Sequence, residues 1–167
     1  YRGEIGTGDF FRACEKEAGI PRLADAAWVR AWRDIFHPLP KALEALAAVP
    51  RGVRRVLVSN TNALHWEGAR RMLAPPSLFD ELVLSFRVGA AKPSRAFWHA
   101  ALDAARCNPG ECLYADDRPE LVAAAAALGI PGFVVDGARS FAEGLAAHGL
   151  VPASAGNTEP ERPVRVS

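Results

Sequence analysis

Glu111-Cys-Leu-Tyr-Ala-Asp-Asp-Arg-Pro-Glu120 is the stretch from which the fold of this chain can be worked out. Its short apolar run, residues 112–115, is typical of a buried strand and ends in two adjacent carboxylates, Asp116 and Asp117. Pro119 stands where a helix would begin, and an alanine-rich apolar run follows it. The stretch therefore predicts a strand that leads directly into a helix, with acids at the carboxyl end of the strand.

The same alternation extends over residues 38–150. Further strands are expected over residues 53–58, 81–88 and 132–135, because these runs are short and rich in Val, Leu and Phe. The predicted helices between the strands cover 41–49, about 60–73, 94–105, about 119–128 and 139–148. Short apolar strands that alternate with helices predict an α/β fold with a parallel sheet.

Both ends of the chain differ from this pattern. Residues 1–37 carry no strand signal and are expected to form helices, the first capped by Thr7 or Asp9 and ended by Gly19. Trp28 and Trp32 lie at helical spacing and are interpreted as core packing. A proline-rich joint at residues 37–40, which includes His37, separates this part from the main body. Residues 151–167, rich in Pro, Ser, Gly and charge, are expected to be a disordered tail.

The composition excludes several classes of protein. The 20 basic and 19 acidic residues give a formal charge of +1, which gives no support for a nucleic-acid or membrane-surface role. The three cysteines are too few and too scattered for a disulfide framework or a zinc site, so a cytoplasmic location is expected. No apolar run approaches the length of a membrane-spanning helix.

Polar groups follow three of the predicted strands, and the carboxyl ends of parallel strands face the same crevice. Ser59 or Thr61 offers a hydroxyl, and Asn60 an amide and a backbone N–H for an anion. Lys92 offers a positive charge for a phosphoryl oxygen. The two acids, Asp116 and Asp117, would suit Mg²⁺. Taken singly, each has a structural explanation as a helix cap or a solvated charge. Together they are the parts that neutralise a phosphoryl group during its transfer. His65 follows this cluster and could face either the crevice or the surface.

The order of three motifs carries a resemblance to a known family. Val-Leu-Val-Ser59-Asn-Thr-Asn, then Gly89-Ala-Ala-Lys92-Pro, then Leu-Tyr-Ala-Asp116-Asp117 resembles the haloacid dehalogenase (HAD) superfamily, over residues 1–150. The chain looks most like the sugar-phosphate phosphatases of that family and the phosphatase domain attached to some epoxide hydrolases.

The resemblance implies a Rossmann-like parallel sheet, with residues 1–37 as part of a helical cap. It further implies that Ser59 binds the phosphoryl group, that Lys92 balances charge at the nucleophile, and that Asp116 and Asp117 serve the magnesium site. Glu4 matches a recurring cap position and receives no role.

The chain departs from the family at one essential point. The nucleophilic aspartate of the family, and the acid two residues after it, belong to a first strand upstream of the cap. No such strand precedes Tyr1. The resemblance therefore implies a core that lacks its first strand, which in the family lies between the strands ending here at Val58 and Ala115. We expect the 167 residues alone to be inactive.

Two alternatives to a phosphatase stay open. A 2-haloacid dehalogenase shares the scaffold but needs no magnesium and usually lacks the acid pair, and a non-catalytic pseudo-enzyme would keep the pocket for binding alone. A phospho-signalling receiver domain uses similar groups, but its acids come before the hydroxyl and the lysine, and the order in this chain argues against it. The expected partner is a small phosphorylated metabolite, and the expected state is a monomer or a weak dimer.

Overall fold

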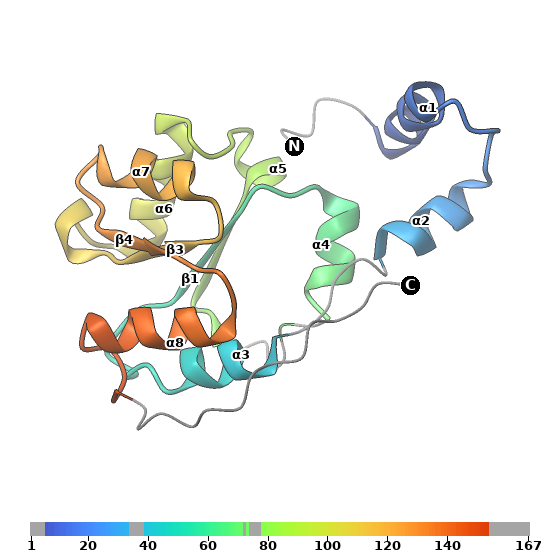
Figure 1. Cartoon of the computed structure of the whole chain (residues 1–167). Coiled ribbons are helices and arrows are strands. Elements are labelled where there is room, and N and C mark those ends of the chain that lie inside the picture. Colours follow the sequence, from blue (N-terminus) through green and yellow to red (C-terminus); the bar gives the residue numbers. More distant parts are fainter. Residues whose placement is uncertain (1–5, 34–38, 72, 74–77, 154–167) are drawn as a thin grey trace.

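The computed structural model of the 167-residue chain describes residues 6–33, 39–71, 73 and 78–153. It contains a core of short parallel strands with helices on both sides, and a pair of helices at the N-terminal end (Figure 1). The second helix of that pair contacts the helix that follows the first strand. The prediction of an α/β fold with parallel strands is confirmed.

The described strands form two parallel pairs. β1 (Val56–Ser59) pairs with β2 (Glu81–Leu84), and β3 (Tyr114–Asp116) pairs with β4 (Gly132–Val134). Among the described residues the two pairs share no ladder of hydrogen bonds. The polar ends of β1 and β3 nevertheless come together, because the side chain of Lys92 contacts both.

The strand predicted over residues 81–88 is half as long as expected. Its second half is the helical turn α5 (Ser85–Val88), which ends at Gly89 with a φ of +67°. The cause lies at Ser85, whose hydroxyl donates to Thr61 O at 2.8 Å and accepts from Thr61 N at 2.9 Å. This exchange replaces the ladder between β1 and β2 and lets the chain turn away. The left-handed conformation of Gly89, which glycine adopts without strain, redirects the chain toward residue 92.

Helices cover the strands from both sides (Figure 1). On one side lie α6 (Arg95–Ala105), α7 (Pro119–Ala126) and the short helix η2 (Pro109–Glu111), and on the other α3 (Pro40–Ala47) packs against α8 (Ala138–Ala147). The helix α4 (Ala63–Ala69) follows β1.

Local signals set several of these helix boundaries as predicted. Asn62 accepts from His65 N at 2.8 Å and Ser94 from Phe97 N at 3.4 Å, so both act as N-caps. Pro119 occupies the first turn of α7.

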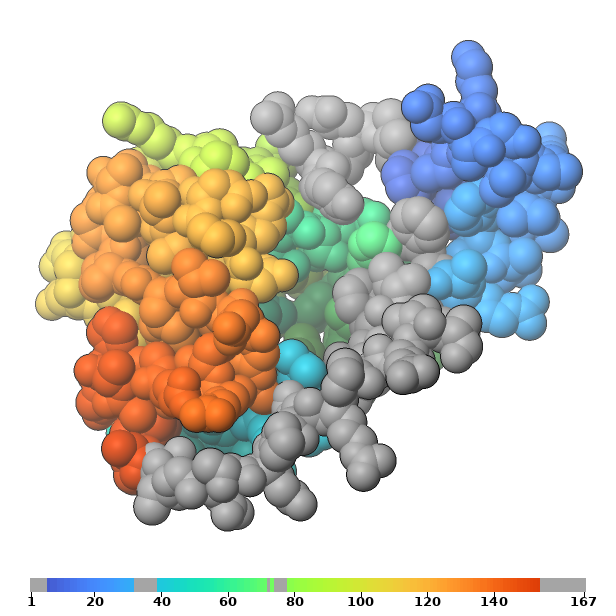
Figure 2. Space-filling view, in the orientation of Figure 1, coloured from blue at the N-terminus to red at the C-terminus, as the bar shows by residue number. Residues whose placement is uncertain are grey.

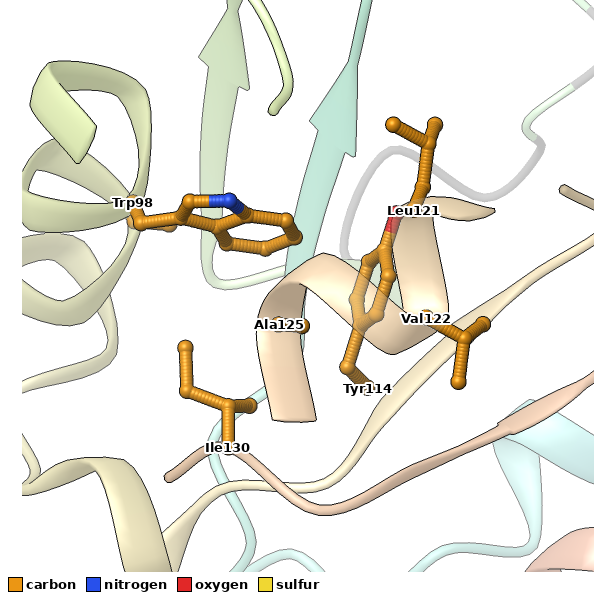
Figure 3. Close-up of a cluster of buried hydrophobic side chains, with 7 residues drawn as sticks. Trp98, Tyr114, Leu121, Val122, Ala125 and Ile130 are labelled. Carbon is orange, nitrogen blue, oxygen red and sulfur yellow. The ribbon is translucent and has the colours of Figure 1, made fainter. Parts of the chain in front are cut away.

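A cluster of buried side chains fills the space between β3, α6 and α7 (Figure 3). At its centre the rings of Trp98 and Tyr114 meet edge to face, with centroids 4.9 Å apart at an angle of 86°. Edge-to-face contact places the positive rim of one ring against the negative face of the other. The other members are Ala101, Leu121, Val122, Ala125 and Ile130.

The N-terminal helices are α1 (Thr7–Ala18) and α2 (Asp25–Arg33), which lie at the opposite side of the molecule from α7 and α8 (Figure 2). Phe11 stacks on Trp28 at 5.4 Å, and the buried carboxylate of Glu15 accepts from Trp28 Nε1 at 2.7 Å. Trp28 is thus core packing, as predicted.

The prediction of the N-cap of the first helix was wrong. Gly6, not Thr7 or Asp9, precedes α1, and no side chain caps the helix there. The αL conformation of Gly19 ends α1 as expected.

Some predictions fall outside the described residues. These concern Glu4, His37, the side chain of Trp32 and the tail residues 154–167. In the part of the chain that the structure describes, no helix has both the length and the apolar character needed to cross a membrane.

We predict that Gly132→Ala weakens the contact between β3 and β4. A Cβ at this position would lie 2.4 Å from Tyr114 O, a backbone atom that cannot rotate away. We expect the free energy of unfolding to fall by about 1–3 kcal/mol, as for other overpacked sites, in a denaturant titration. Gly52→Ala is the matched control, because its Cβ would meet nothing within 4 Å. Equal stability of the two variants would contradict this account of β4.

Candidate active site

The centre of the site is the side chain of Lys92, which is only 9% exposed. Its Nζ donates to Asp116 Oδ2 at 2.6 Å, to the hydroxyl of Tyr114 at 3.0 Å and to Val58 O at 3.3 Å. Val58 belongs to β1 and the other two partners to β3. One ammonium group therefore connects the polar ends of the two strand pairs.

Asn60 holds the backbone of Lys92 in place. Its amide nitrogen donates to Lys92 O at 2.9 Å, and its amide oxygen accepts from Lys92 N at 2.7 Å. The peptide bond between Lys92 and Pro93 is cis. Both polar atoms of the Asn60 amide are thus engaged by the chain itself, so this side chain positions Lys92. The backbone N–H of Asn60 lies directly after β1, at the position where an anion is expected from the sequence.

The carboxylate of Asp116 is surrounded by donors. Besides the Lys92 ammonium, Oδ2 is hydrogen-bonded to the Tyr114 hydroxyl, and Oδ1 accepts from Arg118 N at 3.0 Å. Burial acts to raise the pKa of Asp116, but the hydrogen bonds from Lys92, Tyr114 and Arg118 prevail and hold this pKa below its ordinary value. Asp116 is therefore a stable anion, ready to accept positive charge or hydrogen bonds.

Tyr114 is buried, and its ring belongs to the core cluster. Burial raises the pKa of Tyr114 well above its ordinary value, and the hydrogen bond to Asp116 adds to this effect. The phenol thus stays protonated and acts as a hydrogen-bond donor.

Ser59 and Asp117 stand at the same ends of β1 and β3. Ser59 is half-buried, the last residue of β1, and is paired in register with Leu84. Asp117 is exposed and directly follows the last residue of β3. In the part of the chain that is described, Asn60, Lys92 and Asp116 are joined by hydrogen bonds, while the side chains of Ser59 and Asp117 take no part in that network. Their predicted roles stay predictions.

Sequence reasoning missed two side chains that shape the site. Tyr114 lies two residues before Asp116 on the same strand, so the alternation of a strand places both on one face. That spacing could have revealed it. Ser85 is fully buried at the end of β2 and is bonded to the backbone of Thr61, and no pattern in the sequence pointed to it.

His65 lies in the first turn of α4 and is half-buried. Burial lowers the pKa of His65, which favours the neutral imidazole. Its backbone N–H is used by the Asn62 cap.

The two adjacent acids at the end of β3 could supply part of a magnesium site. Asp116 and Asp117 offer carboxylate oxygens, which Mg²⁺ prefers, and they are adjacent in the chain. Among the described residues, however, there is no group of three or more His, Cys, Asp or Glu side chains that could hold a metal. Asp116 also already faces the Lys92 ammonium. The two acids fit the cation chemically but need further oxygen ligands.

Parallel strands thus bring a lysine, a hydroxyl and an acid pair to one end of an α/β fold, and comparison with known proteins identifies the family. The model of the haloacid dehalogenase-like hydrolase family matches residues 4–129, so the chain belongs to that family.

Individual relatives are more distant. A sesquiterpene phosphatase of Aspergillus oryzae is 27% identical over 132 residues, which make up 78% of this chain and 67% of that protein. A HAD family enzyme of Bacteroides thetaiotaomicron, solved in complex with magnesium and inorganic phosphate, matches with a TM-score of 0.68 and 25% identity, over 81% of this chain and 72% of that chain. A predicted HAD-like hydrolase of Porphyromonas gingivalis shares the fold, with a TM-score of 0.66, 24% identity, and 81% and 69% coverage.

We predict that Lys92 and Asp116 are strongly coupled in stability. Lys92→Met leaves a buried carboxylate without its cation, and Asp116→Asn leaves a buried ammonium without its anion. We expect each single variant to lose about 3–5 kcal/mol of unfolding free energy. The double variant should lose less than the sum, by about 1–3 kcal/mol, in denaturant titrations of all four proteins.

The matched control is the exposed pair Arg139–Glu143, whose atoms approach nearly as closely, at 2.7 Å. The same cycle on this pair should give about 0.5 kcal/mol or less, since water screens exposed charges. Similar coupling in both cycles would contradict the buried character of the Lys92 site.

Proposed function

We propose that this protein is a magnesium-dependent phosphatase of HAD type that hydrolyses a small phosphorylated metabolite. The observation that carries the proposal is the buried Lys92 ammonium held against Asp116 at the ends of β1 and β3. A fixed positive charge in a partly dry site stabilises the negative charge that spreads over a transferring phosphoryl group. The phosphatase from Aspergillus oryzae and the phosphate complex from Bacteroides support this choice.

Each residue has a role in this proposal. Lys92 neutralises charge beside the nucleophile and the phosphoryl oxygens, and Asn60 keeps its backbone in place. Ser59 donates its hydroxyl to a phosphoryl oxygen, with the backbone N–H of Asn60 beside it. Tyr114 orients both Lys92 and Asp116 by hydrogen bonds to each.

Asp116 and Asp117 would hold the magnesium ion, Asp116 through Oδ1, the oxygen that Lys92 does not contact. The chemistry that a magnesium ion supplies in such a site is neutralisation of charge on the phosphoryl oxygens. The acid pair also favours a phosphatase over a 2-haloacid dehalogenase, whose reaction needs no cation.

The nucleophile is proposed to come from a strand outside these 167 residues. An aspartyl-phosphate mechanism requires a carboxylate that is free to attack, and Asp116 is engaged by Lys92 and Tyr114. β1 and β3 are not paired with each other in the described part of the chain, yet Lys92 contacts both. A strand placed between them would complete one sheet and set its terminal carboxylate beside the Lys92 ammonium. The N-terminal helices α1 and α2 would then be part of a cap.

We predict that residues 1–167 alone release no phosphate from a panel of sugar phosphates and prenyl phosphates with Mg²⁺. A longer chain that includes the natural preceding segment should be active, and Lys92→Met in that chain should lower turnover about 10²–10³-fold, because one fixed charge is removed from the transition state. Release of inorganic phosphate is measured, with chloride release from 2-chloropropionate as the dehalogenase arm.

Lys41→Met is the matched control, since Lys41 is exposed on α3 and distant in sequence from every site residue. It should keep full activity. Undiminished phosphate release by Lys92→Met would exclude the role given to Lys92. Activity of the short chain that disappears in Asp116→Asn would show that the nucleophile lies within these residues.

We also predict that Mg²⁺ binds at the acid pair even in the 167-residue chain, though weakly, because further ligands are needed. Backbone NMR signals of residues 116–118 should shift first as magnesium is added. Asp117→Asn should abolish these shifts, whereas Asp136→Asn, which changes another exposed acid, should not. Shifts distributed evenly over the surface would count against this site.

A further inference from the structure

Two of the three cysteines lie together, although sequence analysis described them as scattered. Cys107 Sγ and Cys112 Sγ are 2.6 Å apart. Arg106, in the left-handed conformation at φ +58°, ends α6, and Cys112 directly follows η2. The tight connection between α6 and β3 thus folds back on itself and brings the two thiols into contact.

The connection is held in this shape by its own hydrogen bonds. Glu111 accepts from Asn108 N at 2.8 Å and from the Asn108 side-chain nitrogen at 2.9 Å. Cys112 N donates to Pro109 O at 3.2 Å. These bonds hold the backbone in the conformation that brings the two sulfur atoms together.

The two thiols differ in their surroundings. Cys107 borders an open surface hollow of about 400 Å³, whereas Cys112 packs against the core cluster. The charges around the hollow are mixed, one basic and two acidic. Its lining consists of Leu102, Asp103, Arg106, Cys107, Asn108 and Glu111. A solute in the hollow therefore meets Cys107, and the Cys112 sulfur lies in contact with the Cys107 sulfur.

Burial raises the pKa of the Cys112 thiol to about 12, and the hydrogen bond with Cys107 adds to this effect. A thiol with such a pKa is a poor nucleophile toward solutes, because the thiolate is the reactive form. Cys112 can still attack a sulfur atom that is bonded beside it, since contact replaces diffusion. This asymmetry assigns the first step to Cys107 and the second to Cys112.

We propose that Cys107 and Cys112 form a reversible disulfide by exchange with a small-molecule disulfide such as oxidised glutathione. The Cys107 thiolate attacks one sulfur of glutathione disulfide, so that a mixed disulfide forms and one glutathione thiolate leaves. Cys112 then loses its proton to solvent and attacks the Cys107 sulfur, which releases the second glutathione. Two protein thiols are oxidised to one disulfide, and one glutathione disulfide is reduced to two glutathione thiols.

The site adjoins the candidate active site through the chain. Cys112 lies two residues before Tyr114, the first residue of β3, which also carries Asp116. A disulfide would close residues 107–112 into a covalent ring at the entrance to this strand. The redox state of the pair would thereby be connected to the position of β3, while the exchange reaction itself requires no phosphatase activity.

The test uses the 167-residue chain with Cys14→Ser, so that only the pair remains. After incubation with oxidised glutathione and removal of small molecules, we expect the thiol content to fall from two to zero, measured with a thiol reagent. The intact mass should decrease by two hydrogen atoms, with no glutathione attached. Both thiols should return after treatment with dithiothreitol.

Single variants in the same background separate the two roles. Cys112→Ser should accumulate one glutathione on Cys107, and Cys107→Ser should accumulate little on Cys112 in the same time. Circular dichroism checks that both variants fold. Glutathione attached to both cysteines of the pair, an unchanged thiol content, or a disulfide between two chains on a non-reducing gel would each overturn the proposal.

Discussion

The burial of one ammonium group governs the arrangement of this protein. Removing a charge from water costs several kcal/mol unless partners of opposite charge and polarity replace the water. Lys92 finds those partners on two different strands: a carboxylate and a phenol on β3, and a carbonyl on β1. Strands that share no ladder in the described residues are therefore connected by a side chain, and the loop that carries it has to be fixed as firmly as the strands.

Polar side chains around that loop hold it in place. Asn60 binds the backbone of Lys92 with both ends of its amide, and Ser85 does the same for Thr61 with one hydroxyl. Each side chain substitutes for backbone ladder bonds that end where β1 and β2 diverge. The charges are thus held in position before any ligand arrives, which is what electrostatic catalysis requires.

The parts of the fold that could be predicted from sequence depend on local rules. Asn62 and Ser94 cap helices through their own side chains, and Pro119 starts α7 through its fixed φ. The early end of β2 and the contact of Cys107 with Cys112 could not be predicted, because they depend on groups brought together by folding.

The candidate site was likewise predicted only in part. Lys92 and Asp116 were found from their places at or after the ends of strands. The hydrogen bonds between the Asn60 amide and the backbone of Lys92 were not predicted. Tyr114 was missed for a different reason, since the alternation of β3 already placed it beside Asp116.

Tyr114 has one end in the core and the other in the site. Its ring packs against Trp98 (Figure 3). Its hydroxyl is hydrogen-bonded to both Lys92 and Asp116. In evolution, the interior of a protein usually drifts without altering its chemistry, because volume-conserving exchanges among apolar side chains are tolerated. Here that freedom is restricted, because a change in the size of Trp98 or Leu121 would tilt the phenol that packs against them and move the hydrogen bonds of its hydroxyl. Substitutions in this core would therefore change the reactivity of the site. Selection on activity would then act on core residues that do not contact a substrate.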